Sequence, residues 1–165
     1  MHHQPEKQFE SLIKEHQLLL LKVCRMYAYT SEDRQDLFQD IVLHSWNAFP
    51  RFRGEAKFST WLYRVAINTA VTRIRKKQRS VYDKQEFEEG FEIIDNNTNQ
   101  EEEERLQDLH AAISRLNQVE KAIVMLYMEE RSYEEMEEIL GMSQGSLRTK
   151  MSRIKEKLRQ ITKNI

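Results

Sequence analysis

The chain has little of what builds disulfides, tight turns or membrane spans. Its 165 residues include one cysteine, Cys24, so no internal disulfide can form, which fits a reducing cytoplasm. The leucine run at residues 18–21 is far too short to cross a bilayer. The N-terminus also lacks the long apolar stretch of a signal peptide. We therefore expect a cytoplasmic protein that does not insert into a membrane.

Glycine and proline are scarce as well, with four and two copies. Few turn formers, together with a charged fraction of 32%, favour helices with wide solvated faces over a sheet. The many unbranched Glu, Lys, Arg, Gln, Leu and Met side chains agree, because they lose little rotamer freedom in a helix. The predicted fold class is all-α, with two small helical domains joined by an acidic linker.

The formal net charge of −1 conceals an uneven distribution of charge. Residues 1–80 carry 14 Lys or Arg and 8 Asp or Glu, residues 81–110 carry 2 and 11, and residues 111–165 carry 10 and 8. Two positive modules on a negative connector are indicated, so the overall charge does not argue against a nucleic-acid partner. We predict domains at 1–80 and 106–165 and an acidic linker at 81–105.

Apolar residues at helical spacing predict the elements of both domains. The first domain is predicted to hold three helices, at 9–29, 32–49 and 59–79. The second is predicted to hold four. Thr30 with Asp33 is a helix start signal, and Ser132 with Glu135 is another. Gly141 supplies a left-handed helix stop.

The sharpest local signal is a helix-turn-helix at residues 132–159, where a short helix, a turn and a longer helix follow one another. Leu147, Met151 and Ile154 form the inner stripe of the longer helix. The polar side chains on its other side can reach base edges or phosphates in the major groove. An ordinary helical hairpin with a solvated basic face is the alternative.

The third predicted helix carries a polar face and nearby aromatic rings. The polar face consists of Arg64, Asn68, Thr72, Arg75 and Arg79. Cations beside rings such as Phe58 and Trp61 suit single-stranded DNA, because bases stack on rings and phosphates meet cations. Core positions for the two rings, and a solvated basic helix end, form the competing interpretation.

Three carboxylates, Asp33, Asp36 and Asp40, share one face of the predicted 32–49 helix, nearly opposite its apolar stripe. Such a set could hold a metal or act as an acid catalyst, and a metal-dependent nuclease is the least favoured alternative. No His or Cys completes a ligand set, so we expect no metal site, no cofactor and no catalysis. A solvated face and a docking surface for a basic partner are the interpretations left.

The order of these signals resembles one family. DLFQDIVLHSW at 36–46, FRG at 52–54 and FSTWLYRVAIN at 58–68 resemble region 2 of bacterial extracytoplasmic-function (ECF) sigma factors. SYEEMEEILGMS at 132–143 and GSLRTKMSR at 145–153 resemble region 4. The chain departs from the family pattern at Thr72, where Asp is usual, and at Met136-Glu137-Glu138, where Ala usually follows the paired acids.

The resemblance implies a non-enzymatic subunit that directs core RNA polymerase to promoters and assists melting, binding promoter DNA as duplex and as single strand. Polymerase docking is implied for Asp36, Gln39 and Asp40. Contacts with the minus-ten element are implied for Phe58, Trp61, Arg64, Asn68 and Arg75. Contacts with the minus-thirty-five element are implied for Gln144, Ser146, Arg148, Thr149, Ser152 and Arg153. An anti-sigma factor is a further implied partner. The alternative, a helix-turn-helix regulator that binds duplex DNA without polymerase, explains residues 132–159 alone.

Overall fold

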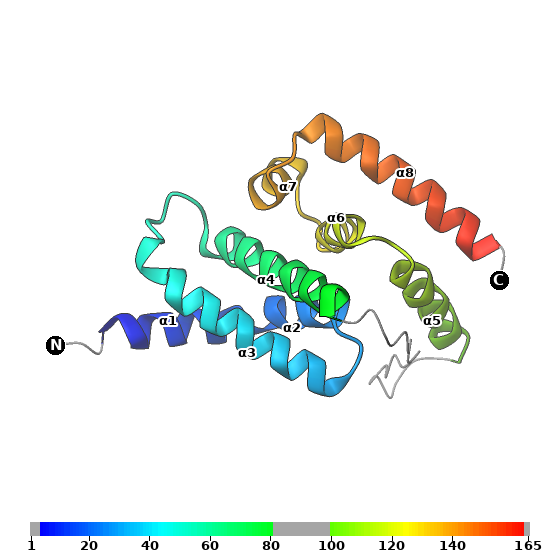
Figure 1. The fold of residues 1–165 in the computed structure, drawn as a ribbon. Coiled ribbons are helices and arrows are strands. Elements are labelled where there is room, and N and C mark those ends of the chain that lie inside the picture. The colour runs from blue at the N-terminus through cyan, green and yellow to red at the C-terminus, as the bar shows by residue number, and fades with distance from the viewer. Residues whose placement is uncertain (1–3, 81–99, 164–165) are drawn as a thin grey trace. The chain divides into compact units, whose positions relative to one another are not determined.

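The computed structural model describes residues 4–80 and 100–163, and this part of the chain contains helices and no strand (Figure 1). The predicted all-α class is confirmed. The chain divides into two compact units, residues 1–88 and 89–165. Most of the predicted linker lies outside the described residues, and its last part, from Gln100, is already the start of a helix.

The first unit contains α-helices and one short 3-10 helix. They are α1 (Gln4–Glu15), α2 (Gln17–Tyr27), α3 (Ser31–Ala48), η1 (Phe49–Arg51) and α4 (Phe58–Ser80). Thr30 caps α3 as predicted, since its hydroxyl oxygen accepts a hydrogen bond from the backbone N–H of Asp33 at 3.1 Å. This satisfies one of the donors that a helix start leaves without a backbone partner.

The prediction of one helix over 9–29 is wrong, because His16 separates α1 from α2. Its backbone leaves the helical region at φ −104° and ψ 19°. Its Nδ1 lies 2.8 Å from the carbonyl oxygen of Leu12, and its ring packs 5.0 Å from that of Phe58. The apolar periodicity continues through the break, so it does not reveal a contact between residues so distant in sequence.

Helices α2, α3 and α4 pack against one another and enclose the core of the first unit. Its side chains are at most 2% exposed and include Leu20, Val23, Leu37, Ile41 and Leu62. Burying each such side chain contributes about 1.5–3 kcal/mol, so this core fixes the relation between α3 and α4. Functional groups on those two helices are therefore held in one frame.

The second unit consists of four described helices, α5 (Gln100–Ser114), α6 (Gln118–Met128), α7 (Tyr133–Leu140) and α8 (Gln144–Lys163). Helix α8 packs against the other three. Met136, Leu147 and Ile154 are at most 1% exposed and join α7 to α8. No described helix is long and apolar enough to cross a membrane.

The predicted helix-turn-helix is confirmed in its local geometry. The Ser132 hydroxyl oxygen accepts from the backbone N–H of Glu135 at 3.1 Å and so begins α7. Gly141 ends α7 in the left-handed region at φ 69°, a conformation that costs glycine nothing. The Ser143 hydroxyl then accepts from the backbone N–H of Ser146 at 3.2 Å at the start of α8.

Candidate protein and nucleic-acid interfaces

The acidic row, defined as Asp33, Asp36 and Asp40 of α3, meets cations of α4. Arg73 Nη1 donates to Asp40 Oδ2 at 2.6 Å, and Arg73 Nη2 lies 3.6 Å from Asp36 Oδ2. Lys77 Nζ donates to Asp33 Oδ1 at 3.1 Å. The row thus pairs in part with cations of the chain itself, a contact that neither interpretation of the sequence included, and its role as a docking surface stays a prediction.

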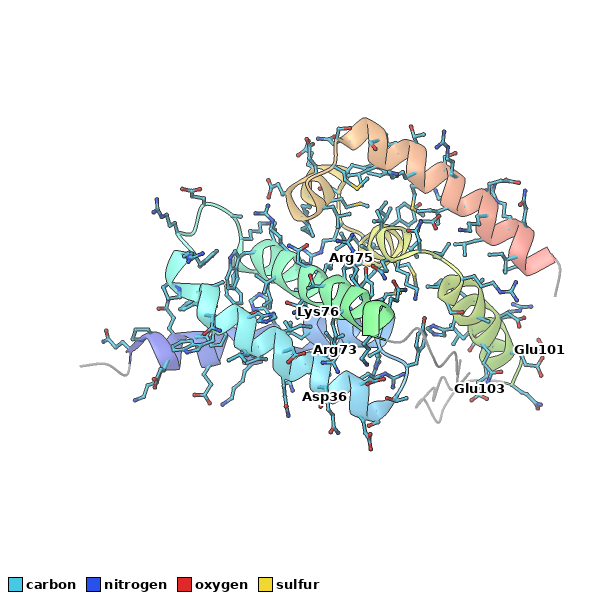
Figure 2. All side chains as sticks on the ribbon, viewed as in Figure 1. Asp36, Arg73, Arg75, Lys76, Glu101 and Glu103 are labelled. Atoms are coloured by element: carbon cyan, nitrogen blue, oxygen red, sulfur yellow. The ribbon has the colours of Figure 1, made fainter. Side chains whose placement is uncertain are left out.

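The cations at the end of α4 divide between two sides of the helix. Arg73 faces α3, toward Asp36, whereas Arg75 lies on another side of the helix (Figure 2). Lys77, four residues after Arg73, likewise faces α3, where it pairs with Asp33. Two residues along a helix correspond to a rotation of about 200°, which explains this division. Arg75 and Lys76 are exposed, whereas Arg73 is half-buried against α3.

The three aspartates differ in how much of each carboxyl group is accessible. The Asp36 side chain is 63% exposed, against 47% for Asp40 and 22% for their shared partner Arg73. Burial acts to raise the pKa of Asp33, but its hydrogen bond and charge interaction with Lys77 prevail and hold that pKa below its ordinary value. A partner approaching this face therefore meets Asp36 first.

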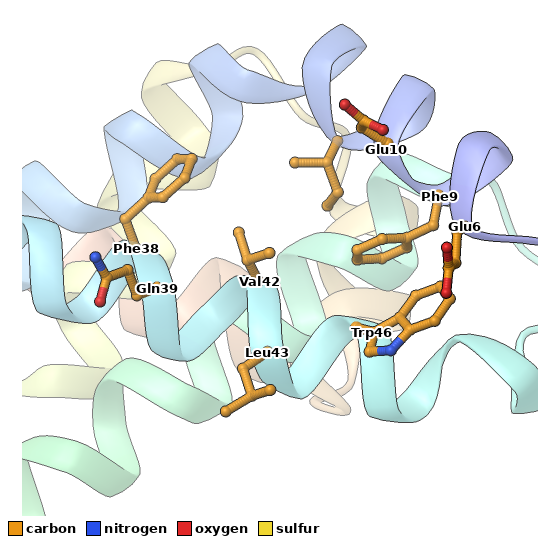
Figure 3. A pocket seen from close by; sticks show the side chains of 9 residues that line it. Glu6, Phe9, Glu10, Phe38, Gln39, Val42, Leu43 and Trp46 are labelled. Carbon is orange, nitrogen blue, oxygen red and sulfur yellow. The ribbon is translucent and has the colours of Figure 1, made fainter.

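An apolar groove of about 580 Å³ runs between α1 and α3, the helix that carries the acidic row (Figure 3). We call it the α1–α3 groove. Its lining residues are Glu6, Phe9, Glu10, Ile13, Phe38, Gln39, Val42, Leu43 and Trp46. Gln39, a predicted polymerase contact, lines the groove, and Leu43 is 56% exposed. Sequence reasoning missed this groove because it depends on how α1 packs on α3.

The aromatic residues that precede and begin α4 form one cluster. The ring centroids of Phe52, Phe58 and Trp61 lie 5.3–5.6 Å from one another. Phe58 is 9% exposed and belongs to the core, so its ring is not presented to a ligand in this conformation. Trp61 is only half-buried. The same two interpretations were predicted for both rings, but their environments in the fold differ.

A hollow of about 290 Å³ lies where the 51–56 loop meets α4, and we call it the loop hollow. Its lining residues are Arg51, Phe52, Arg53, Glu55, Ala56, Thr60, Trp61 and Arg64. Trp61 and Arg64, two of the predicted minus-ten residues, are thus brought together with two loop arginines that sequence reasoning did not select. The signal available in the sequence was the pair Arg51 and Arg53, one on each side of an aromatic residue.

The remaining predicted minus-ten residues, Asn68 and Arg75, lie along the exposed side of α4 together with Thr72. Asn68, Thr72 and Arg75 are all exposed and follow one another at spacings of four and three residues. Residues at that spacing share a helix face, so α4 carries a polar surface that begins at the loop hollow. The side chain of Arg79 lies outside the described residues.

The recognition helix α8 separates its two sides as predicted. Leu147, Met151 and Ile154 are at most 4% exposed, while Arg148, Thr149, Ser152 and Arg153 are exposed and Gln144 and Ser146 are half-buried. The Thr149 hydroxyl donates to the carbonyl oxygen of Gly145 at 3.0 Å, so only its acceptor capacity remains for a ligand. Arg148 lies 4.9 Å over the Tyr133 ring.

The acid-catalyst alternative gains no support from this geometry. Within residues 4–80 and 100–163, no group of three or more His, Cys, Asp or Glu is arranged to hold a metal ion. Two of the three aspartates that could have formed such a group hydrogen-bond to cations of α4. The interfaces described above are suited to binding a protein and a nucleic acid.

Comparison with known proteins agrees with this division. Residues 12–80 match the family model of Sigma-70 region 2, and residues 106–158 match that of Sigma-70 region 4. The ECF RNA polymerase sigma-E factor of Escherichia coli K12 is 31% identical over 162 residues, covering 92% of this chain and 84% of that protein. RNA polymerase sigma-H factor of Pseudomonas aeruginosa is 26% identical, covering 92% and 84%.

Solved structures share the fold. The sigma factor RpoE of Bartonella quintana, crystallised with the anti-sigma factor NepR, matches with a TM-score of 0.78 at 22% identity, covering 95% of this chain and 98% of that one. CnrH, solved in complex with the cytosolic domain of CnrY, matches with a TM-score of 0.68 at 19% identity, covering 96% and 90%. The matches to region 2 and region 4 on the two helical units define the class as a sigma-70-type transcription initiation factor. The chain belongs to the ECF family of sigma-70-type sigma factors, proteins that direct RNA polymerase to promoters.

Proposed function

We propose that α3 docks core RNA polymerase while α4 and α8 bind the two elements of the promoter. The observation that carries this proposal is that one packed unit exposes two unlike surfaces. An acidic and apolar surface lies on α3 and α1, and a cationic, aromatic surface lies on α4 and the preceding loop. Opposite charge favours different partners at the two surfaces.

The docking surface consists of Asp36, Gln39 and Asp40 together with the α1–α3 groove. Asp36 keeps most of its side chain exposed although it shares Arg73, so it can still accept from a basic partner. The groove beside it supplies apolar area, and Leu43 is positioned to be buried on docking. An apolar centre with charges at its edge is the usual composition of a protein interface.

Promoter melting is assigned to the loop hollow and the polar surface of α4. The hollow combines a half-buried indole with Arg51, Arg53 and Arg64, which suits a base that has left its stack and the phosphates beside it. Capturing such a base offsets an unstacking cost of a few kcal/mol. Asn68 and Arg75 extend this surface along the path of the DNA strand, and the ring of Phe58 packs against that of Trp61.

Recognition of the upstream duplex is assigned to the exposed side of α8, where Gln144, Ser146, Arg148, Thr149, Ser152 and Arg153 face outward or lie at the edge. The first residues of a recognition helix are those that reach base edges. Polymerisation chemistry belongs to core polymerase, so the chain itself is not an enzyme and takes no cofactor. The chain acts in the cytoplasm, where the polymerase transcribes.

An anti-sigma factor is a further proposed partner. RpoE of Bartonella quintana was crystallised with one, and CnrH with the cytosolic domain of CnrY, and this chain shares their fold. In this chain the exposed apolar lining of the α1–α3 groove offers such a protein a surface that overlaps the docking surface for polymerase.

In vitro transcription tests the proposal directly. Core polymerase with and without the full chain is supplied with a promoter-sized DNA library, and the transcripts are sequenced. We expect start sites that depend on the chain and share two upstream sequence elements. The alternative is a helix-turn-helix regulator. It would be supported if the chain binds duplex DNA but neither co-purifies with core polymerase nor changes its start sites.

A further inference from the structure

Arg148 is held by two contacts before any DNA is present. Its guanidinium carbon lies 4.9 Å from the centroid of the Tyr133 ring, and its Nη2 donates to Gln144 Oε1 at 3.5 Å. Among the described residues, the other exposed side chains near it on α8, Thr149 and Ser152, have no comparable ring contact. Arg148 is therefore the side chain of this surface whose direction is set by α7, the first helix of the motif.

Tyr133 is itself fixed in place. It is the first residue of α7, directly after the Ser132 cap, and it is half-buried. Two residues later, Glu135 pairs with Arg131 at 3.2 Å and donates its backbone N–H to the cap. The start of α7 is thus anchored on both sides of Tyr133, so the ring can serve as a rigid support.

A guanidinium that packs on a ring face can still donate hydrogen bonds to base edges. The attraction between a cation and the ring arises from the electron density of the face and does not require a hydrogen-bond acceptor. Arginine has five N–H donors in a planar fork, and a fork held in one direction loses less freedom when it binds. Arg148 lies one turn into α8, where recognition helices reach base edges.

We infer that Tyr133 is a positioning residue that aims Arg148 at one base pair of the upstream promoter element, with guanine as the base read by the fork. This inference rests on the proposed function, because it assumes that α8 reads duplex promoter DNA. Tyr133 acts through Arg148 and increases discrimination at that base pair without reading the sequence itself.

The test uses holoenzyme assembled from core polymerase and the full chain. It transcribes a library in which the upstream promoter region is randomised, and sequenced transcripts give the base preference at each position. Arg148→Ala is expected to reduce the preference at one base pair about 5- to 150-fold. Tyr133→Leu is expected to reduce the preference at the same base pair about two- to fivefold. Tyr133→Phe keeps the ring and is expected to match the wild type.

The double variant and a matched control separate positioning from a general loss of structure. Tyr133→Leu added to Arg148→Ala is expected to change nothing further, because the two residues act as one unit. Tyr127→Leu removes a similar contact, that of Lys155 Nζ at 4.7 Å from the Tyr127 ring, and is expected to leave all preferences intact.

A uniform loss at every position in Tyr133→Leu, an equal loss in Tyr133→Phe, or additive effects in the double variant would overturn the inference. So would unchanged preferences in Arg148→Ala. In each of these cases wild-type transcripts still show selected upstream sequences. Failure of the proposed function looks different, because the wild-type holoenzyme would then select no upstream sequence at all.

Discussion

The acidic row on α3 and the exposed side of α8 were inferred from the same kind of pattern, polar residues opposite an apolar stripe, but the fold uses them differently. The aspartates of α3 bind Arg73 and Lys77 of α4, so they hold two helices together as well as facing outward. Thr149, Ser152 and Arg153 of α8 make no such contact with another described helix.

This difference decides what a mutation measures. A change in the acidic row affects both the packing of α3 on α4 and any partner that docks there. A change on the exposed side of α8 affects recognition with little effect on folding, because surface substitutions usually alter stability by less than about 0.5 kcal/mol. Experiments on the acidic row therefore need a compensating variant, whereas a control substitution suffices for the exposed side of α8.

The largest expected effect comes from Asp36→Arg with Asp40→Arg. Like charges facing a basic partner cost several kcal/mol, so binding to core polymerase should weaken more than about a hundredfold in a pull-down or a titration. The new arginines also face Arg73, so the first unit should lose about 1 kcal/mol of stability. Both tryptophans, Trp46 and Trp61, lie in this unit, so their fluorescence reports its melting alone.

Adding Arg73→Asp sharpens this experiment, because it restores attraction between α3 and α4 with the charges exchanged. We expect the triple variant to regain most of its melting temperature, a recovery of roughly 4–8 °C per kcal/mol in a domain of this size, and to remain unable to bind polymerase. Recovery of both properties would show that the acidic row is a structural element and that docking occurs elsewhere.

The next effect concerns Arg153→Ala on α8. If Arg153 reads a base, discrimination at one base pair should fall by about 1–3 kcal/mol, and if it binds a phosphate, the salt slope of promoter binding should fall by about one. Binding measured at several salt concentrations distinguishes the two. Arg159→Ala is the matched control on the same helix, where Arg159 pairs with Glu156 at 3.6 Å. Equal behaviour of both variants would argue against specific reading by Arg153.

A smaller effect is expected for Asn68→Ala on α4. Its amide can donate to and accept from the edge of an unpaired base, so promoter opening should slow about tenfold, which corresponds to about 1.4 kcal/mol. A premelted template should recover part of the loss, because the unstacking cost is already met. Permanganate footprinting on duplex and bubble templates measures this.

Asn47→Ala is the control for this prediction, since Asn47 is an exposed asparagine on α3. It should open promoters at the wild-type rate. A defect of Asn68→Ala that is equally large on both templates would assign Asn68 to base affinity or structure and not to melting.

The last prediction concerns the reactivity of Cys24, which reports on the packing of the first unit because Cys24 is the sole cysteine. Burial raises its pKa to about 11, although Arg34 and Arg73 act to lower it. The native thiol should therefore resist maleimide at pH 8 and react on unfolding. Stability linked to this group is present below its ordinary pKa of 9.0 and lost as the pH rises toward 11. Faster labelling in the Asp36→Arg, Asp40→Arg variant would confirm the packing role of the row.

Much of the fold follows from local signals in the sequence. The caps at Thr30, Ser132 and Gly141 are satisfied by residues at most a few positions away, so their chemistry is independent of the tertiary fold. The buried stripe of α8 is likewise a matter of period 3.6. For the same reason, the candidate recognition residues on that helix could be named in advance, and their roles stay predictions.

Local patterns in the sequence were therefore enough to predict the class of elements, most of their ends and the polar side of each helix, because these depend on neighbours within one or two turns. Three features required the folded structure: His16 interrupts the first helix, Phe58 enters the core while Trp61 remains partly exposed, and Arg73 faces Asp36 and Asp40. The contacts of Arg73 with these aspartates and of His16 with Phe58 join residues 33 to 42 positions apart, so the packing of the helices creates them and no local pattern encodes them.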